Sequence, residues 1–215
     1  AQRMQSVDAE LIVLPRHANV IFQGGGIFPD TYVDRIASAK LDGRPAVARA
    51  IPVFLDTVRL GGQQQRLFAV DPDDLPEFLI GRRMCEGTMF TGGAAFKKRL
   101  DELRNGQRRY DPDAVTNDEL NRACELIIDS RLARVGPYRV GDETDVVGIV
   151  EAGVAGRVFA PIQTIRHILN GGVPWSSMFF VKLTPAVRAD ADRLADMLAE
   201  DLNAKVELKT QYGSL

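Results

Sequence analysis

The regular hydrophobic patterns of this sequence lie at its two ends, and an irregular stretch separates them. Residues 1–72 predict a strand, a helix and a long hairpin, and residues 146–215 predict two strands, a helix, a strand, a helix and a closing strand. Residues 73–145 carry turn signals and basic pairs with little strand pattern. We therefore predict an α+β fold of two lobes: the two chain ends build a βαβ-rich lobe with a mixed sheet, and residues 73–145 form an inserted mixed α/β lobe.

In the first part, short apolar runs alternate with turn signals. Glu10–Pro15 predicts a strand that ends at its proline, and a helix follows the cap candidates Asp30 and Thr31. Val47–Leu60 predicts a long strand, and Pro52 indicates a bulge or an edge position within it. The Gly-Gly-Gln-Gln turn that follows returns the chain as the second strand of a hairpin.

The last third contains the clearest helix pattern. Residues 184–203 predict one helix with Thr184 as its cap and Pro185 at its first position. An earlier helix is predicted with Pro161 in its first turn. In the middle part we expect short helices at 73–80 and 94–103. The segment Cys-Glu-Leu-Ile-Ile-Asp at 124–129 predicts either a strand or the body of a helix.

The overall charge excludes one class of partner. The 215 residues include 27 basic and 29 acidic side chains, a net charge of −2. Nucleic-acid binding needs a basic face, which this balance does not favour. No segment approaches the ~18 apolar residues of a membrane helix. The chain as given is expected to be soluble, which leaves open that it belongs to a longer membrane protein.

The two cysteines, Cys85 and Cys124, exclude a disulfide-rich scaffold and a cysteine-rich zinc site. They could form one bridge outside the cytosol. We favour the simpler interpretation that both are small, buried apolar residues.

A glycine loop, Phe-Gln-Gly-Gly-Gly-Ile-Phe-Pro-Asp at 22–30, separates the first strand from the first helix. Such an arrangement cradles phosphates when a lysine and a hydroxyl residue follow, or when a third glycine lets helix and strand pack closely. Here Ile27 and Phe28 follow Gly26, and Pro29 occupies the place of the third glycine. We therefore predict a flexible or strained turn, and no cofactor.

The sequence contains none of the catalytic patterns we sought. His17 and His167 are each isolated, without ligand-spaced partners, so no metal site is predicted. No serine lies in a Gly-x-Ser-x-Gly elbow. We predict no catalytic residue and a protein that is not an enzyme. The alternative is a small α+β hydrolase or transferase with a carboxylate-based site, and a soluble adaptor is a third hypothesis.

Apolar side chains in loops beside basic residues are typical of partner surfaces. The segment 82–90 combines a basic pair with methionines and an aromatic residue, and the single tryptophan lies in a glycine–proline loop. The candidate partner-binding residues are Arg82, Arg83, Met84, Met89, Phe90, Trp175 and Phe28. An equally good interpretation is that these side chains fill the seam between the lobes.

Four segments, taken in order, resemble the extracytoplasmic core domain of MacB-like and FtsX-like ABC transporter permeases. They are the opening strand and turn at 9–25, the run Leu-Ala, Val-Gly-Asp and Val-Val-Gly-Ile within 127–153, the Phe-x-Pro exit into a helix at 157–169, and the closing strand and helix at 179–198. The segment 82–109 matches nothing in this family.

The resemblance implies a function without chemistry. The lobe formed by 1–72 and 146–215 would be proximal to the inner membrane of a bacterium, and the domain would be periplasmic and tethered by membrane helices. Partners would be a cytoplasmic ATPase, a second permease copy or paralogue, and a periplasmic adaptor, lipoprotein carrier or cell-wall enzyme. ATPase-driven movement would pass through the membrane to this domain, serving export, lipoprotein release or partner activation. The isolated domain is expected to be mostly monomeric.

Overall fold

The chain forms two compact units in a computed structural model. The residues that the structure describes are 7–16, 27–60, 63–90, 125–136, 140, 146–153, 156–170 and 173–209. Unit 1 is made of Ala1–Asp56 and Pro174–Leu215, and unit 2 of Thr57–Val173. The predicted α+β class, with one lobe built from both ends of the chain, is confirmed.

The boundaries between the units differ from the predicted ones. We expected them after residues 72 and 145, whereas the chain divides after Asp56 and Val173. The second hairpin strand and the segment 146–173 belong to unit 2, because these strands pair with one another. Strand β10 (Val158–Pro161) runs parallel to β6 (Gln63–Val70), with Val158 opposite Leu67.

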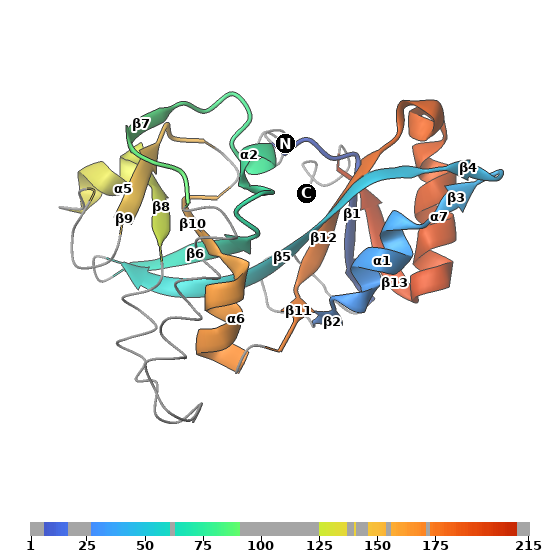
Figure 1. The fold of residues 1–215 in the computed structure, drawn as a ribbon, viewed down its shortest axis with the longest axis horizontal. Helices are drawn as coiled ribbons and strands as arrows, with labels where there is room; N and C mark the ends of the chain where they lie inside the picture. The colour runs from blue at the N-terminus through green and yellow to red at the C-terminus, as the bar shows by residue number, and fades with distance from the viewer. Residues whose placement is uncertain are drawn as a thin grey trace. The chain divides into compact units, whose positions relative to one another are not determined.

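Unit 1 contains the first and the last of the helices that the sequence predicted (Figure 1). Its elements in chain order are β1 (Leu11–Pro15), β2 (Phe28–Pro29), α1 (Thr31–Ala37), β3 (Lys40–Leu41), β4 (Arg44–Pro45), the first part of β5 (Val47–Leu60), β11 (Trp175–Ser176), β12 (Met178–Leu183), the 3₁₀ helix η1 (Pro185–Asp190), α7 (Ala191–Leu202) and β13 (Ala204–Leu208).

The strands of unit 1 follow a recognisable topology. Their order is β13-β1-β12-β5, and each neighbouring pair is antiparallel. Strands β12 and β13 therefore run parallel on either side of β1, with α7 as their crossover. In the same way β1 and β5 flank β12, with α1 between them in the chain. This is the ferredoxin-like β-α-β-β-α-β arrangement, with unit 2 inserted between its second and third strands.

The core of unit 1 lies between one face of these strands and the two helices. Alternate residues of β1 and β12, such as Leu11 and Phe179, point to this face, and Ile36 of α1 and Leu198 of α7 close it. Figure 1 shows α7 running beside β13. Because these side chains are essentially inaccessible to solvent, each contributes roughly 1.5–3 kcal/mol of burial free energy.

The last helical segment differs from the single helix that we predicted. Pro185–Asp190 forms a 3₁₀ helix and only Ala191–Leu202 is α-helical. Thr184 occupies the N-cap position but makes no side-chain cap; its hydroxyl instead donates to the carbonyl of Pro45 at 2.9 Å. Tertiary contact with the β4 hairpin therefore takes the hydroxyl that local capping would use.

Unit 2 contains the remaining elements. They are the end of β5, β6, α2 (Leu75–Phe78), β7 (Met84–Gly87), β8 (Leu126–Asp129), α5 (Ser130–Val135), β9 (Val146–Val150), β10 and α6 (Ile162–Asn170). From β5 the strand order is β6-β10-β8-β9-β7. The segment 124–129, for which the sequence allowed a strand or a helix, contains a strand. It pairs in parallel with β9 across α5, which makes a β-α-β unit.

The core of unit 2 is aromatic and branched aliphatic. Phe68 and Phe159 pack with ring centroids 6.1 Å apart, and Phe78, Ile127 and Val158 of the same unit are fully buried. The predicted helix at 73–80 is confirmed as the shorter α2. The helix predicted at 94–103 lies outside the described residues, as does the glycine loop at 22–26.

Candidate partner-binding surface

The seven candidate residues divide between the two units. Arg82, Arg83 and Met84 lie at the start of β7 in unit 2, and Met89 and Phe90 follow the strand. Phe28 and Trp175 lie in unit 1, on the small ladder between β2 and β11. The sequence-predicted set is therefore two local groups, each with its own surroundings.

Arg82 is held inside unit 2. Its Nε donates to the carbonyl of Glu151 at 2.7 Å and one Nη donates to the carbonyl of Gly156 at 3.4 Å. The guanidinium lies 5.6 Å from the ring centroid of Phe159, at cation–π distance. Burial lowers the pKa of Arg82, and the Asp129 carboxylate opposes part of that shift. These contacts make Arg82 a structural arginine that positions the end of β9.

Arg83 points to solvent beside Arg82. Its side chain is 86% exposed and its Nη2 lies 2.6 Å from a carboxylate oxygen of Glu151. The hydrogen bond from Arg83 holds the pKa of Glu151 below its usual range. The main-chain N–H of Glu151 also donates to the carbonyl of Arg83 at 2.8 Å. Both arginines therefore bond to Glu151 at the end of β9. Of the two guanidinium groups, that of Arg83 is the one that a partner can reach.

The residues after Arg83 differ in exposure. Met89 is 39% exposed, whereas Phe90 is only 6% exposed and belongs to the interior. Met84 packs closely over Gly148 of β9, where a Cβ would lie 3.1 Å from its sulfur. Cys85 is a free, exposed thiol, so our prediction that it is buried is wrong. Cys124 lies outside the described residues.

In unit 1, Phe28 is buried and Trp175 half-buried. The ring of Phe28 lies 5.0 Å from that of Tyr32 and 5.4 Å from that of Phe179. Trp175 pairs with Pro29 on the β2–β11 ladder. Phe28 therefore anchors the start of α1 to the core and leaves Trp175 as the aromatic side chain of this group that a partner can reach.

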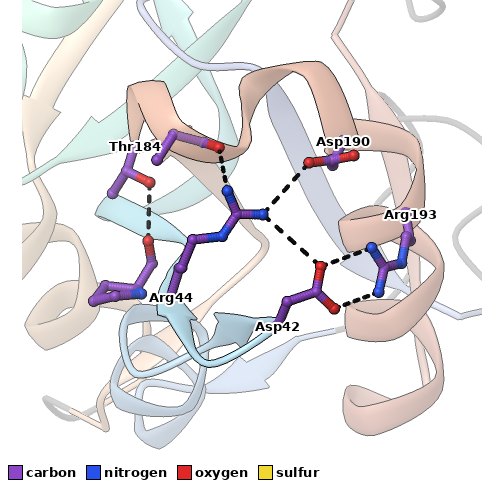
Figure 2. Close-up of polar contacts among 7 residues, drawn as sticks. Asp42, Arg44, Thr184, Asp190 and Arg193 are labelled. Carbon is purple, nitrogen blue, oxygen red and sulfur yellow. Dashed lines mark hydrogen bonds and ion pairs between the residues drawn. The ribbon is translucent and has the colours of Figure 1, made fainter.

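The sequence patterns missed a polar network in unit 1, shown in Figure 2. Asp42, at the tip of the β3–β4 hairpin, accepts two hydrogen bonds from the guanidinium of Arg193 on α7, at 2.5 and 2.9 Å. Arg44 lies 3.8 Å from both Asp42 and Asp190 and donates to the carbonyl of Ala186. The network ties the hairpin to the helix. The Asp-Gly turn in the sequence signals the hairpin but not its partner helix.

Possible metal ligands and shifted carboxylates can be located among the described residues. These residues contain no group of three or more His, Cys, Asp or Glu side chains placed to hold a metal ion. The carboxylates with shifted pKa values, Asp8, Asp42 and Glu151, all have their pKa lowered by a hydrogen bond from a cationic side chain. None of the helices described is long and apolar enough to cross a membrane.

No protein-family model matches the chain, and no curated protein matches it. Two solved structures share its fold. The first is the periplasmic region of MacB from Actinobacillus actinomycetemcomitans, with a TM-score of 0.55 and 11% identity over 97% of this chain and 92% of that one. The second is the extracellular domain of the noncanonic ABC-type transporter YknZ from Gram-positive bacteria. Its TM-score is 0.50, with 13% identity over 93% of this chain and 98% of that one.

At these identities the two matches show a shared fold. The two-unit α+β chain has the fold of the extracytoplasmic regions of these two proteins, and the match to the MacB periplasmic region extends over nearly the whole length of both chains. The resemblance that the sequence motifs suggested is therefore confirmed for the fold.

Proposed function

We propose that this chain is the extracytoplasmic domain of an ABC transporter permease and that it transmits ATPase-driven movement across the membrane without catalysing a reaction. The observation that carries the proposal is the shared fold with the MacB periplasmic region over 97% of this chain. The cytoplasmic ATPase and a second permease copy or paralogue are the partners that this role requires.

The geometry of unit 1 supports a mechanical role. Strands β1 and β13 are paired along their whole length, from Leu11 opposite Leu208 to Pro15 opposite Ala204. The side chain of Lys209 donates to the carbonyl of Val7, just before β1. Movement delivered through either strand therefore reaches the same rigid sheet, since the two strands cannot slide without breaking the ladder between them.

The location can be tested with the exposed thiol of Cys85. In the full-length protein, with every other cysteine replaced, we expect a membrane-impermeant maleimide to label Cys85 in cells whose outer barrier has been permeabilised. Cys85→Ser is the control and should remain unlabelled. Labelling that appears only after the inner membrane is lysed would place the domain in the cytoplasm and overturn the proposal.

The transmission of movement needs its own measurement. In the full-length permease assembled with its ATPase, a distance between a probe in unit 1 and a probe in unit 2 or in the second permease copy should change between ATP-bound and nucleotide-free states. An ATPase variant that binds but does not hydrolyse ATP should hold one of the two distances. Identical distances in all nucleotide states would contradict the transmission role.

For partner contact we propose the accessible members of the candidate set, which are Arg83, Met89 and Trp175. Phe28 and Phe90 are buried, so we assign them to the support of this surface and not to direct contact with the partner. A photo-crosslinking residue at Met89 or Trp175 of the full-length protein should capture an extracytoplasmic protein, and one at the exposed Lys40 should not. Equal capture at Lys40 would argue against a dedicated surface.

A further inference from the structure

Strand β13 is the outermost strand of unit 1. The strand order begins with β13, and among the described residues β1 is the one strand that pairs with it. The pairing shows no register shift from Ala204 to Leu208, and this segment contains neither proline nor glycine. β13 is therefore a regular sheet edge, of the kind to which a strand from another chain can be added.

Strand β7, which ends the same strand order, differs from β13 in these respects. Its register with β9 shifts between Met84 and Glu86, and Gly87 at its end has a φ of 78°. Irregular edges and bulges are among the devices that keep outer strands from pairing with other chains. The described part of the chain therefore has one irregular outer strand and one regular outer strand.

The main-chain groups of β13 alternate between β1 and the opposite side. The N–H of Lys209 donates to the carbonyl of Glu10 at 2.8 Å, so every second residue from Lys209 back to Lys205 faces β1. The N–H and C=O groups of the residues between them, which include Val206 and Leu208, point away from β1. These are the groups that an added strand would pair with.

The side chains on one face of β13 carry opposite charges. Lys205 and Glu207 lie two positions apart, and Nζ of Lys205 lies 2.6 Å from a carboxylate oxygen of Glu207. Their side chains are 41% and 21% exposed. If two copies of β13 pair antiparallel with Val206 opposite Val206, Lys205 of each copy lies opposite Glu207 of the other. This register also joins the outward main-chain groups of both copies, so the edge is complementary to itself in charge and in hydrogen bonding.

We propose that β13 is the edge at which a second copy of this chain binds, antiparallel and with Val206 opposite Val206. A ladder of 5 residues is much smaller than the roughly 1,200–2,000 Å² interface of a stable complex. The dimer is therefore weak in the isolated chain, in keeping with the expected monomer, and it forms where two copies are held close together.

This inference assigns a surface to the second permease copy, and to that extent it rests on the proposed function. The pairing itself is a property of the chain and is tested without a membrane or an ATPase. A negative result on the pairing would leave the location and the transmission role standing, and a cytoplasmic location would leave the pairing standing.

The first test is disulfide cross-linking of the 215-residue chain in a Cys85→Ser, Cys124→Ser background. Tagged Lys205→Cys is mixed with untagged Glu207→Cys and oxidised. In the proposed register these two positions form a directly opposite pair with Cα atoms about 4.5 Å apart, whereas two copies of Lys205 are diagonal neighbours at about 7–8 Å. Only the first distance is within the usual reach of a disulfide.

We therefore expect the mixture to give a cross-linked dimer of one tagged and one untagged chain. The control is the chain that keeps Cys85 and lacks Cys124, because Cys85 is an exposed thiol on the irregular strand β7 and reports random collisions. Neither Lys205→Cys alone nor Glu207→Cys alone should cross-link faster than this control. No mixed dimer, or equal cross-linking in either variant alone, would overturn the proposal.

The second test changes the charges and uses Val206→Cys as the reporter of the symmetric contact. Adding Lys205→Glu or Glu207→Lys places like charges opposite each other at two symmetry-related pairs. Either change should slow the cross-link about two- to twentyfold. The two changes together exchange the charges and should restore the original rate. A rate that ignores the single changes, or that the exchange does not restore, would also overturn the proposal. If Val206→Cys does not fold, the first test decides alone.

Discussion

The main-chain N–H of Lys209 donates to the carbonyl oxygen of Glu10 at 2.8 Å, which continues the β1–β13 ladder by one residue. Residues almost 200 positions apart in the sequence are therefore direct neighbours. Burial lowers the pKa of Lys209, and the nearby Asp8 and Glu10 carboxylates oppose the shift. The pairing joins two segments that are distant in the sequence into unit 1. The contacts inside unit 1 and inside unit 2 can each be tested by substitution.

Replacing Leu11 by alanine should strongly destabilise unit 1. Leu11 is fully buried between the strands and the two helices, so the truncation leaves a cavity in the core. We expect a loss of about 2–5 kcal/mol in the free energy of unfolding, measured by urea titration. Ile27→Ala is the control, since Ile27 is 44% exposed, and it should cost much less. Equal losses would show that the core is not where the structure places it.

Asp42→Asn should lower stability in a pH-dependent way. The hydrogen bonds from Arg193 hold the pKa of Asp42 below its ordinary value of 3.8. Because the folded-state pKa is the lower one, the carboxylate stabilises the fold above pH 3.8, and this contribution is lost as the pH falls through the folded-state value. Asparagine tolerates the positive φ of 52° at this position, so backbone strain is not added.

The measurement is the unfolding midpoint of Asp42→Asn and the unaltered chain from pH 7 down to pH 2. The two midpoints should differ at neutral pH and converge in acid. In an Arg193→Ala background the same substitution should cost less, because its main partner is already absent. If the difference between the two unfolding midpoints is as large at pH 2 as at pH 7, the stabilisation does not come from the Asp42 carboxylate.

Two glycines with positive φ should respond differently to alanine. At Gly43 (φ 76°) an added methyl group would enter open space, whereas at Gly87 (φ 78°) a Cβ would lie 2.1 Å from the carbonyl oxygen of Val147. Gly43→Ala should cost about 1–2 kcal/mol from backbone strain alone. Gly87→Ala should cost clearly more, because the β7–β9 pair must also separate. Similar unfolding free energies for both variants would argue against this close approach.

Arg82 and Arg83 are adjacent in sequence but should differ in their effect on stability. Arg82→Ala removes hydrogen bonds to the carbonyls of Glu151 and Gly156 and the packing over Phe159, and we expect a loss of about 1.5–3 kcal/mol. Arg83→Ala removes an exposed ion pair and should cost less. Urea titration of both variants is the measurement. A larger loss of unfolding free energy in Arg83→Ala than in Arg82→Ala would overturn the assignment of Arg82 to the interior of unit 2 and of Arg83 to its surface.

The local pattern of the sequence was sufficient for most of the regular elements. The run before Pro15, the helix that begins after Asp30 and the two strands of the long hairpin each contain their own signal, and each was confirmed. Asp30 lies at the N-cap position but makes no side-chain cap. The glycine loop lacked the residues that phosphate binding needs, a conclusion that depends on residue types alone. The order of strands and helices was also enough to place both chain ends in one lobe.

Residue type did not predict which side chains around β7 are exposed. Met89 and Phe90 are neighbours with similar hydrophobicity, yet one is exposed and the other buried. Cys85 was expected inside and lies on the outer strand β7. Exposure at the end of a short edge strand depends on which strand pairs beside it, and this pairing involves residues far away in the chain.

What the sequence determined by itself was therefore the local conformations, since hydrophobic period, caps and turn residues act within a few positions. Only the tertiary structure decided where unit 1 ends, which arginine of the pair is held inside, and that Thr184 bonds a hairpin instead of capping its helix. Each of these depends on a contact between segments distant in sequence. Such contacts compete with local preferences through burial and hydrogen bonding, and no local pattern records which of them forms.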